Sequence, residues 1–75
     1  MQHNIYQVVS KNIKKNRQKK GITQKELAKK TGYSYAYIRQ IESIYCTKQF
    51  SIQVIYKISK ALNINIKNMF DDDNI

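Results

Sequence analysis

Four side chains near the middle of the chain are of the types that read base pairs. A glutamine amide can bond N6 and N7 of adenine, an arginine can bond O6 and N7 of guanine, and an alanine methyl or a tyrosine ring can touch the thymine methyl. Because residues three or four apart are neighbours on a helix, a helical segment would bring these side chains together. The residues are Tyr35, Ala36, Arg39 and Gln40. The chemistry that they could perform is recognition of base edges in the major groove of DNA.

The segment around these residues predicts two short helices joined by a tight turn. Thr23 and Glu26 have the spacing of a capping box, which starts a helix. Gly32 suits the end of that helix and the turn, and Ser34 is a favourable N-cap for the next helix. We therefore expect helices over 24–31 and 35–44, with the candidate base-reading residues on the second.

Apolar residues at helical spacing indicate further helices on both sides of this pair. Ile5, Val9 and Ile13 recur every four residues before Gly21, and a similar stripe precedes a short apolar segment near the end of the chain. The last residues, 71–75, form an acidic tail. The expected fold is a compact all-α domain over 1–75. Its five helices cover about 5–20, 24–31, 35–44, 52–62 and 66–70.

The charge and composition of the chain narrow the classes of function. The 75 residues contain 14 Lys and Arg against 5 Asp and Glu, for a net charge of +9. Such an excess favours a polyanionic partner, although a solubilising surface is the alternative. One Cys and one His cannot supply a disulfide, a usual zinc site or a catalytic constellation. No apolar run approaches 18 residues. We expect a cytoplasmic, non-enzymatic protein without metal, cofactor, membrane association or an evident small-molecule ligand.

Many positions at matching offsets resemble the lambda-repressor-like helix-turn-helix domains, the Xre and Cro-repressor family. The resemblance covers about residues 9–70 and implies a five-helix bundle in which helices two and three form the helix-turn-helix. It further implies that helix three lies in the major groove. The matching positions are Ile13, Arg17, Gly21, Thr23, Gln24, Glu26–Ala28, Gly32–Ser34, Tyr37, Ile38, Ile41, Glu42, Ile55, Ile58, Ala61 and Leu62.

The resemblance also implies roles for single residues. Tyr35, Ala36 and Gln40 match positions that face base edges. Gln24 matches the position that grips a phosphate, and Arg17 and Glu42 match an ion pair between helix one and the end of helix three. The candidate phosphate contacts are Gln24, Lys25, Ser34, Tyr37, Ser43, Tyr45 and Lys48. For Tyr37, two interpretations stay open: its hydroxyl reaches a phosphate, or its ring packs on helix two.

The expected function is sequence-specific binding of double-stranded DNA by a transcriptional regulator, with repression as the favoured role. The family resemblance implies a palindromic operator and a homodimer. An antitoxin or a restriction-system controller would use the same binding mode. A non-specific RNA- or DNA-binding protein is a further alternative, although the major groove of RNA is too narrow for a helix. A cationic membrane helix is disfavoured because the apolar positions are spread over five elements.

Overall fold

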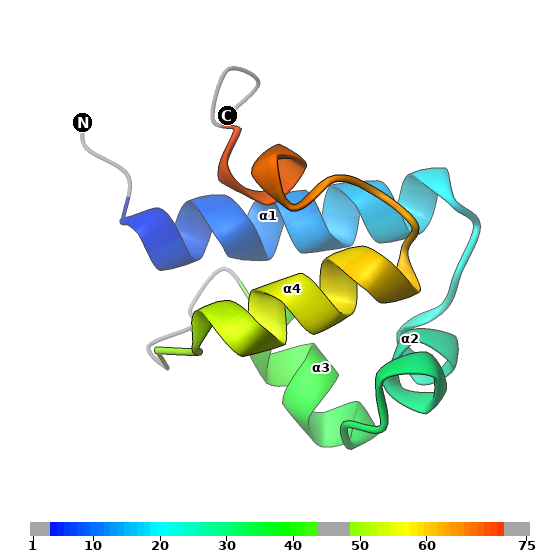
Figure 1. Cartoon of the computed structure of the whole chain (residues 1–75). Coiled ribbons are helices and arrows are strands. Elements are labelled where there is room, and N and C mark those ends of the chain that lie inside the picture. The colour runs from blue at the N-terminus through cyan, green and yellow to red at the C-terminus, as the bar shows by residue number, and fades with distance from the viewer. Residues whose placement is uncertain (1–3, 44–48, 72–75) are drawn as a thin grey trace.

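The computed structural model describes residues 4–43 and 49–71, and within these ranges it is all-helical. Four α-helices, α1 (Ile5–Lys19), α2 (Gln24–Thr31), α3 (Tyr35–Glu42) and α4 (Ile52–Ala61), precede a 3₁₀ helix, η1 (Ile66–Phe70). α1 packs against both α3 and α4, and η1 folds back against α1 and α4 (Figure 1). This arrangement leaves α2 and α3 together at one end of the molecule, joined by a short turn.

Each α-helix begins at a side chain that accepts a hydrogen bond from the backbone. Asn4, Thr23, Ser34 and Ser51 are the four N-caps. The predicted capping box is present: Thr23 Oγ1 accepts from the Glu26 N–H at 3.0 Å, and Glu26 Oε1 accepts from the Thr23 N–H at 2.9 Å. Because a cap satisfies N–H groups that have no partner inside the helix, it fixes where the helix starts.

The turn between α2 and α3 depends on a left-handed residue. Gly32 has φ of 81° and ψ of 3°, and its N–H donates to the Ala28 carbonyl at 2.8 Å. A Cβ built at Gly32 would meet no atom within 4 Å. Glycine is therefore favoured here by its backbone conformation and not by a lack of space.

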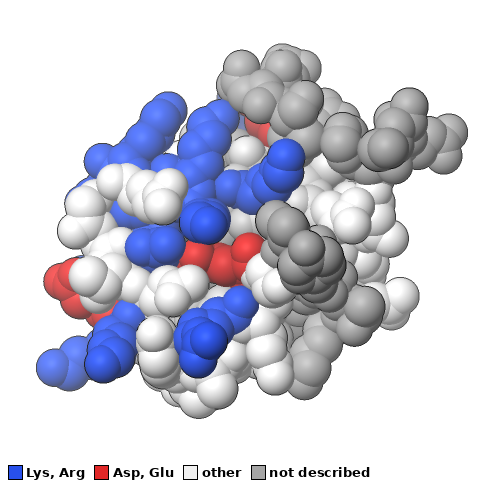
Figure 2. Space-filling view, turned by 180° about the vertical axis from the view of Figure 1, so that it is seen from behind, with Lys and Arg blue, Asp and Glu red and all other residues white. Residues whose placement is uncertain are grey.

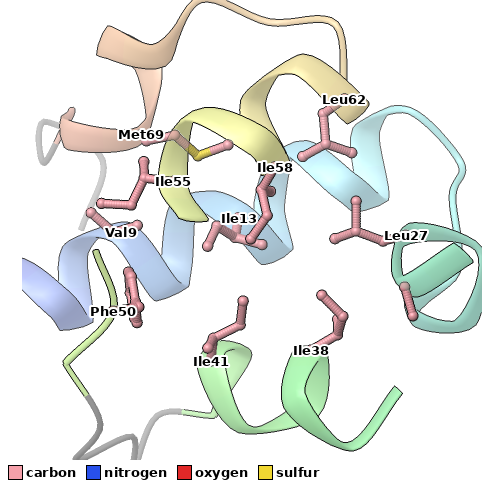
Figure 3. Packing of buried hydrophobic residues seen from close by; sticks show 11 residues of the cluster. Val9, Ile13, Leu27, Ile38, Ile41, Phe50, Ile55, Ile58, Leu62 and Met69 are labelled. Carbon is pink, nitrogen blue, oxygen red and sulfur yellow. The ribbon is translucent and has the colours of Figure 1, made fainter. Parts of the chain in front are cut away.

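One apolar core joins all five elements. Figure 3 shows side chains from α1, α2, α3, α4 and η1 converging on the same centre. Ile13, Leu27, Ile38, Ile58 and Met69 are each fully buried there. Burial of apolar surface contributes about 25 cal/mol of stabilising free energy per Å². Because helices as short as α2 and α3 are not stable alone, packing into this shared core is what holds them in place.

One predicted helix is shorter than expected, and the last helix is of the 3₁₀ type. The helix expected over 35–44 ends at Glu42 because Ser43 is extended, with ψ of 137°; Ile44 lies outside the described residues. The expected fifth helix over 66–70 is a 3₁₀ helix, and its N-cap is Asn65, whose side chain accepts from the Lys67 N–H. Such tight turns are common for helices of only a few residues.

The outer helices end one residue before the predicted limits. α1 ends at Lys19 and α4 at Ala61, with Lys20 and Leu62 as the C-caps. Of the predicted acidic tail at 71–75, the structure describes only Asp71.

The end of the described chain is fastened to α1 by one buried side chain. Asn12 is 3% exposed, and its Nδ2 donates to the Met69 carbonyl at 2.9 Å and to the Asp71 carbonyl at 2.7 Å. An amide nitrogen has two N–H donors, so this single group uses its full donor capacity on the C-terminal segment. Asn12 thereby fixes η1 against the middle of α1.

Candidate nucleic-acid interface

The four predicted base-reading residues lie on the exposed side of α3. Tyr35, Ala36, Arg39 and Gln40 are all exposed, whereas Ile38 and Ile41 on the same helix are completely buried. The helix therefore divides cleanly into a face that packs on the core and a face that is available to a partner. The structure brings the four side chains together as their spacing predicted.

Tyr35 is the centre of a small cationic cluster at the start of α3. Tyr35 is 41% exposed. Lys25 Nζ lies 5.4 Å from the ring centroid and Arg39 Cζ lies 5.6 Å from it. Both separations are within the range of a cation–π interaction. The cluster connects the first turn of α2 with the exposed face of α3.

Arg17 and Glu42 form a buried ion pair behind this face. Arg17 Nε lies 2.7 Å from Glu42 Oε2 and Nη2 lies 3.0 Å from Oε1, which is a two-bond contact. The two side chains are 10% and 2% exposed. Arg17 Nη1 also donates to the Ile22 carbonyl at 2.8 Å. One guanidinium thus links α1, the segment before α2 and the end of α3.

The structure adds a third member to this pair that the sequence did not reveal. Gln24, the first residue of α2, donates from Nε2 to Glu42 Oε1 at 3.0 Å. Since an amide nitrogen carries two N–H donors, one donor remains for a partner such as a phosphate. Gln24 and Glu42 are 18 residues apart, so no local pattern could have shown that Glu42 orients the Gln24 amide.

The other described candidates for phosphate contact differ in their exposure to solvent. Lys25 and Ser34 are exposed, and Ser34 Oγ accepts from the Tyr37 N–H at 3.0 Å, which leaves its own O–H able to donate. Tyr37 is half-buried with its ring 5.2 Å from that of Tyr33, in an edge contact. Ser43 is half-buried and is the C-cap of α3.

Two of the candidate phosphate contacts, Tyr45 and Lys48, lie outside the described residues. Of the two interpretations of Tyr37, the structure shows a ring contact, but to Tyr33 in the turn. A hydroxyl contact with a phosphate stays a prediction.

The acidic groups near this surface are engaged within the protein. Figure 2 shows a face on which Lys and Arg side chains gather around a small acidic area. The pKa of the Glu26 carboxyl is lowered, chiefly by the hydrogen bond from the Thr23 backbone N–H and next by the interaction with the Thr23 side chain. The charge of Lys30 acts in the same direction. Glu42 is buried against Arg17. Both acids before the tail therefore have structural partners.

Two further findings describe residues 4–43 and 49–71 only. No group of three or more His, Cys, Asp or Glu side chains in these ranges could hold a metal ion. None of the helices there is long and apolar enough to cross a membrane.

Comparison with known proteins places this architecture in a family. The chain belongs to the helix-turn-helix family HTH_3, whose model matches residues 13–67, from the middle of α1 to the start of η1. A relative is the HTH-type transcriptional regulator SinR of Bacillus subtilis, 32% identical over 65 residues. That match covers 87% of this chain and 58% of SinR, so the chain spans little more than half of the length of this relative.

Two solved structures have a similar fold. The restriction-modification controller protein C.AhdI of Aeromonas hydrophila has a TM-score of 0.78 at 25% identity, over 87% of this chain and 96% of the other. The hypothetical transcription factor NHTF of Neisseria has a TM-score of 0.82 over 91% of this chain and 76% of the other. At 24% identity, the second likeness supports the fold alone.

Proposed function

We propose that this chain binds double-stranded DNA sequence-specifically and regulates transcription, with α2 and α3 as its helix-turn-helix unit. The observation that carries the proposal is the exposed face of α3. Its side chains lie outside the core and are those of Tyr35, Ala36, Arg39 and Gln40. A major groove about 12 Å wide admits one α-helix. α3 would lie in that groove with these four side chains against the base edges.

The phosphate backbone would be held beside the recognition helix by α2. A helix N-terminus favours phosphate through its unpaired N–H groups and its dipole. Gln24, at this N-terminus, keeps one amide donor after bonding Glu42, and exposed Lys25 follows it directly in sequence. Exposed Ser34 caps the start of α3. Lys25, Ser34 and the remaining candidates Tyr37, Ser43, Tyr45 and Lys48 complete the proposed set.

A homodimer on a palindromic operator extends the proposal. An eight-residue recognition helix reads only a few base pairs, and two copies about one turn of DNA apart would double the recognised sequence. Repression follows if such an operator overlaps a promoter. Control of a restriction system is a second candidate role, favoured by the likeness to C.AhdI, and it would use the same interface.

Selection of bound sites from a random duplex library at stated salt tests the proposal. We would compare the unchanged protein with Gln40→Ala and with Gln53→Ala, a matched control on the exposed side of α4. The expected result is a two-fold symmetric site whose preference at one position per half-site is lost only in Gln40→Ala. Salt-sensitive binding without any enriched sequence, or stronger binding to structured RNA than to the duplex, would refute it.

A further inference from the structure

We infer that Tyr35 acts as a positioning residue, whose ring holds the Arg39 guanidinium toward a guanine in each half-site. The inference rests on the proposed function and gives Tyr35 a role other than direct contact with a thymine methyl. In this arrangement Arg39 contacts the guanine, and Tyr35 holds the Arg39 side chain in position.

The first observation is the geometry of the pair. Tyr35 and Arg39 are four residues apart on α3, so their side chains emerge on the same side of the helix. Arg39 Cζ lies 5.6 Å from the centroid of the Tyr35 ring. A guanidinium is planar and weakly hydrated, and aromatic faces bind it well. The ring can therefore hold the long, exposed Arg39 side chain in one position.

The second observation concerns the N–H donors of Arg39. Among residues 4–43 and 49–71, the ion pair that the structure contains is Arg17 with Glu42, and no hydrogen bond there is donated by Arg39. Its ring contact uses the π-face interaction and leaves the N–H donors unused. An arginine held in this way can present two parallel donors to O6 and N7 of guanine.

The third observation separates Arg39 from the phosphate contacts. The same ring also lies 5.4 Å from Lys25 Nζ, which comes from the first turn of α2. Tyr35 thus lies beside one cation at the helix N-terminus that is proposed to hold a phosphate, and beside one cation farther along the exposed face of α3. Fixing a charged side chain before binding lowers the side-chain entropy lost on binding. The consequence is a guanine preference that depends on the ring and not on the tyrosine hydroxyl.

The experiment starts from the duplex selected by the unchanged protein. We would measure Kd on this duplex and on a copy in which the guanine assigned to Arg39 is replaced by 7-deazaguanine, which lacks the N7 acceptor. The variants are Tyr35→Phe, Tyr35→Ala and Arg39→Ala, with Tyr56→Ala as a matched control because Tyr56 is exposed on α4. Circular dichroism melting of each variant would verify that it is folded.

The unchanged protein should bind the modified duplex several-fold more weakly, by less than the roughly 5- to 150-fold worth of a full bidentate base contact, because 7-deazaguanine retains O6. Arg39→Ala should show no such loss. Tyr35→Ala should shrink the loss by about 2- to 5-fold, the worth of an exposed cation–π contact, whereas Tyr35→Phe and Tyr56→Ala should preserve it.

Several results would overturn the inference while leaving the proposed function intact. They are a selected site without guanine, a loss that persists in Arg39→Ala, and full guanine discrimination in Tyr35→Ala. A loss of discrimination in Tyr35→Phe would also overturn it, because the hydroxyl would then be the reader. Failure to select any sequence would remove the proposed function itself and this inference with it.

Discussion

Replacing Glu42 by alanine should destabilise the protein far more than an ordinary surface substitution. The change removes both acceptors of the Arg17 guanidinium, at 2.7 and 3.0 Å, and leaves Arg17 with the Ile22 carbonyl as its remaining described partner. It also frees the Gln24 amide. Because both charged side chains are at least nine-tenths buried, solvent can screen little of the loss.

The magnitude follows from the cost of leaving a buried charge unpaired. Breaking such a pair by removing one partner costs about 3–5 kcal/mol. At about 0.05–0.15 kcal/mol per residue, the whole domain has a free energy of unfolding of about 4–11 kcal/mol. Glu42→Ala should therefore remove about a quarter or more of the total stability. Glu42→Gln should also be costly, since it retains an acceptor but not the compensating charge.

Urea denaturation followed by circular dichroism measures this effect. Since the dependence on urea is about 1–3 kcal/mol per M, the midpoint should fall by at least about 1 M. Gln53→Ala, an exposed change on α4, should alter the free energy of unfolding by less than about 0.5 kcal/mol. The double substitution Arg17→Met with Glu42→Leu removes both charges and should recover at least half of the loss. A Glu42→Ala loss no larger than that of Gln53→Ala would refute the reasoning.

Three further changes test other parts of the fold by urea denaturation, by its pH dependence and by amide exchange. Gly32→Ala should cost about 1–2 kcal/mol because the residue has positive φ; an unchanged midpoint would contradict the role given to this turn. Thr23 lowers the pKa of Glu26, so the native state should lose stability as pH falls below about 4.3. Glu26→Gln should flatten that part of the pH profile, and equal slopes in both proteins would exclude the effect. Asn12→Ala leaves carbonyls such as that of Met69 without their donor, at a cost of about 1–3 kcal/mol, and should speed amide exchange in η1; unaltered exchange there would disprove the fastening.

Local signals in the sequence predicted the starts of the helices well. Thr23 and Ser34 are N-caps in the structure, as predicted, because the capping hydrogen bond joins residues only three positions apart. The ends were harder to predict. Ser43 leaves the helical conformation one residue after Glu42, and the sequence there contains no glycine or proline to mark the change.

The residues of the candidate site could be predicted from the sequence, but the contacts between them could not. Periodicity placed Arg39 and Gln40 on an exposed face, since that depends on helical spacing alone. The bond from Gln24 to Glu42 and the contact of Lys25 with Tyr35 join different helices. Such contacts depend on how α2 and α3 pack, and this is decided by the core that they share.

The fastening of η1 to α1 bears on when the chain can fold during its synthesis. Asn12 and Met69 are 57 residues apart, and Met69 fills the same core as Ile13 near the other end of the described chain. A nascent chain that stops before η1 exposes the part of α1 against which η1 packs and leaves the Asn12 amide without its carbonyl partners. Folding to the final state must therefore wait until nearly all of the described residues have emerged from the ribosome, and truncation before Met69 should yield a chain prone to aggregation.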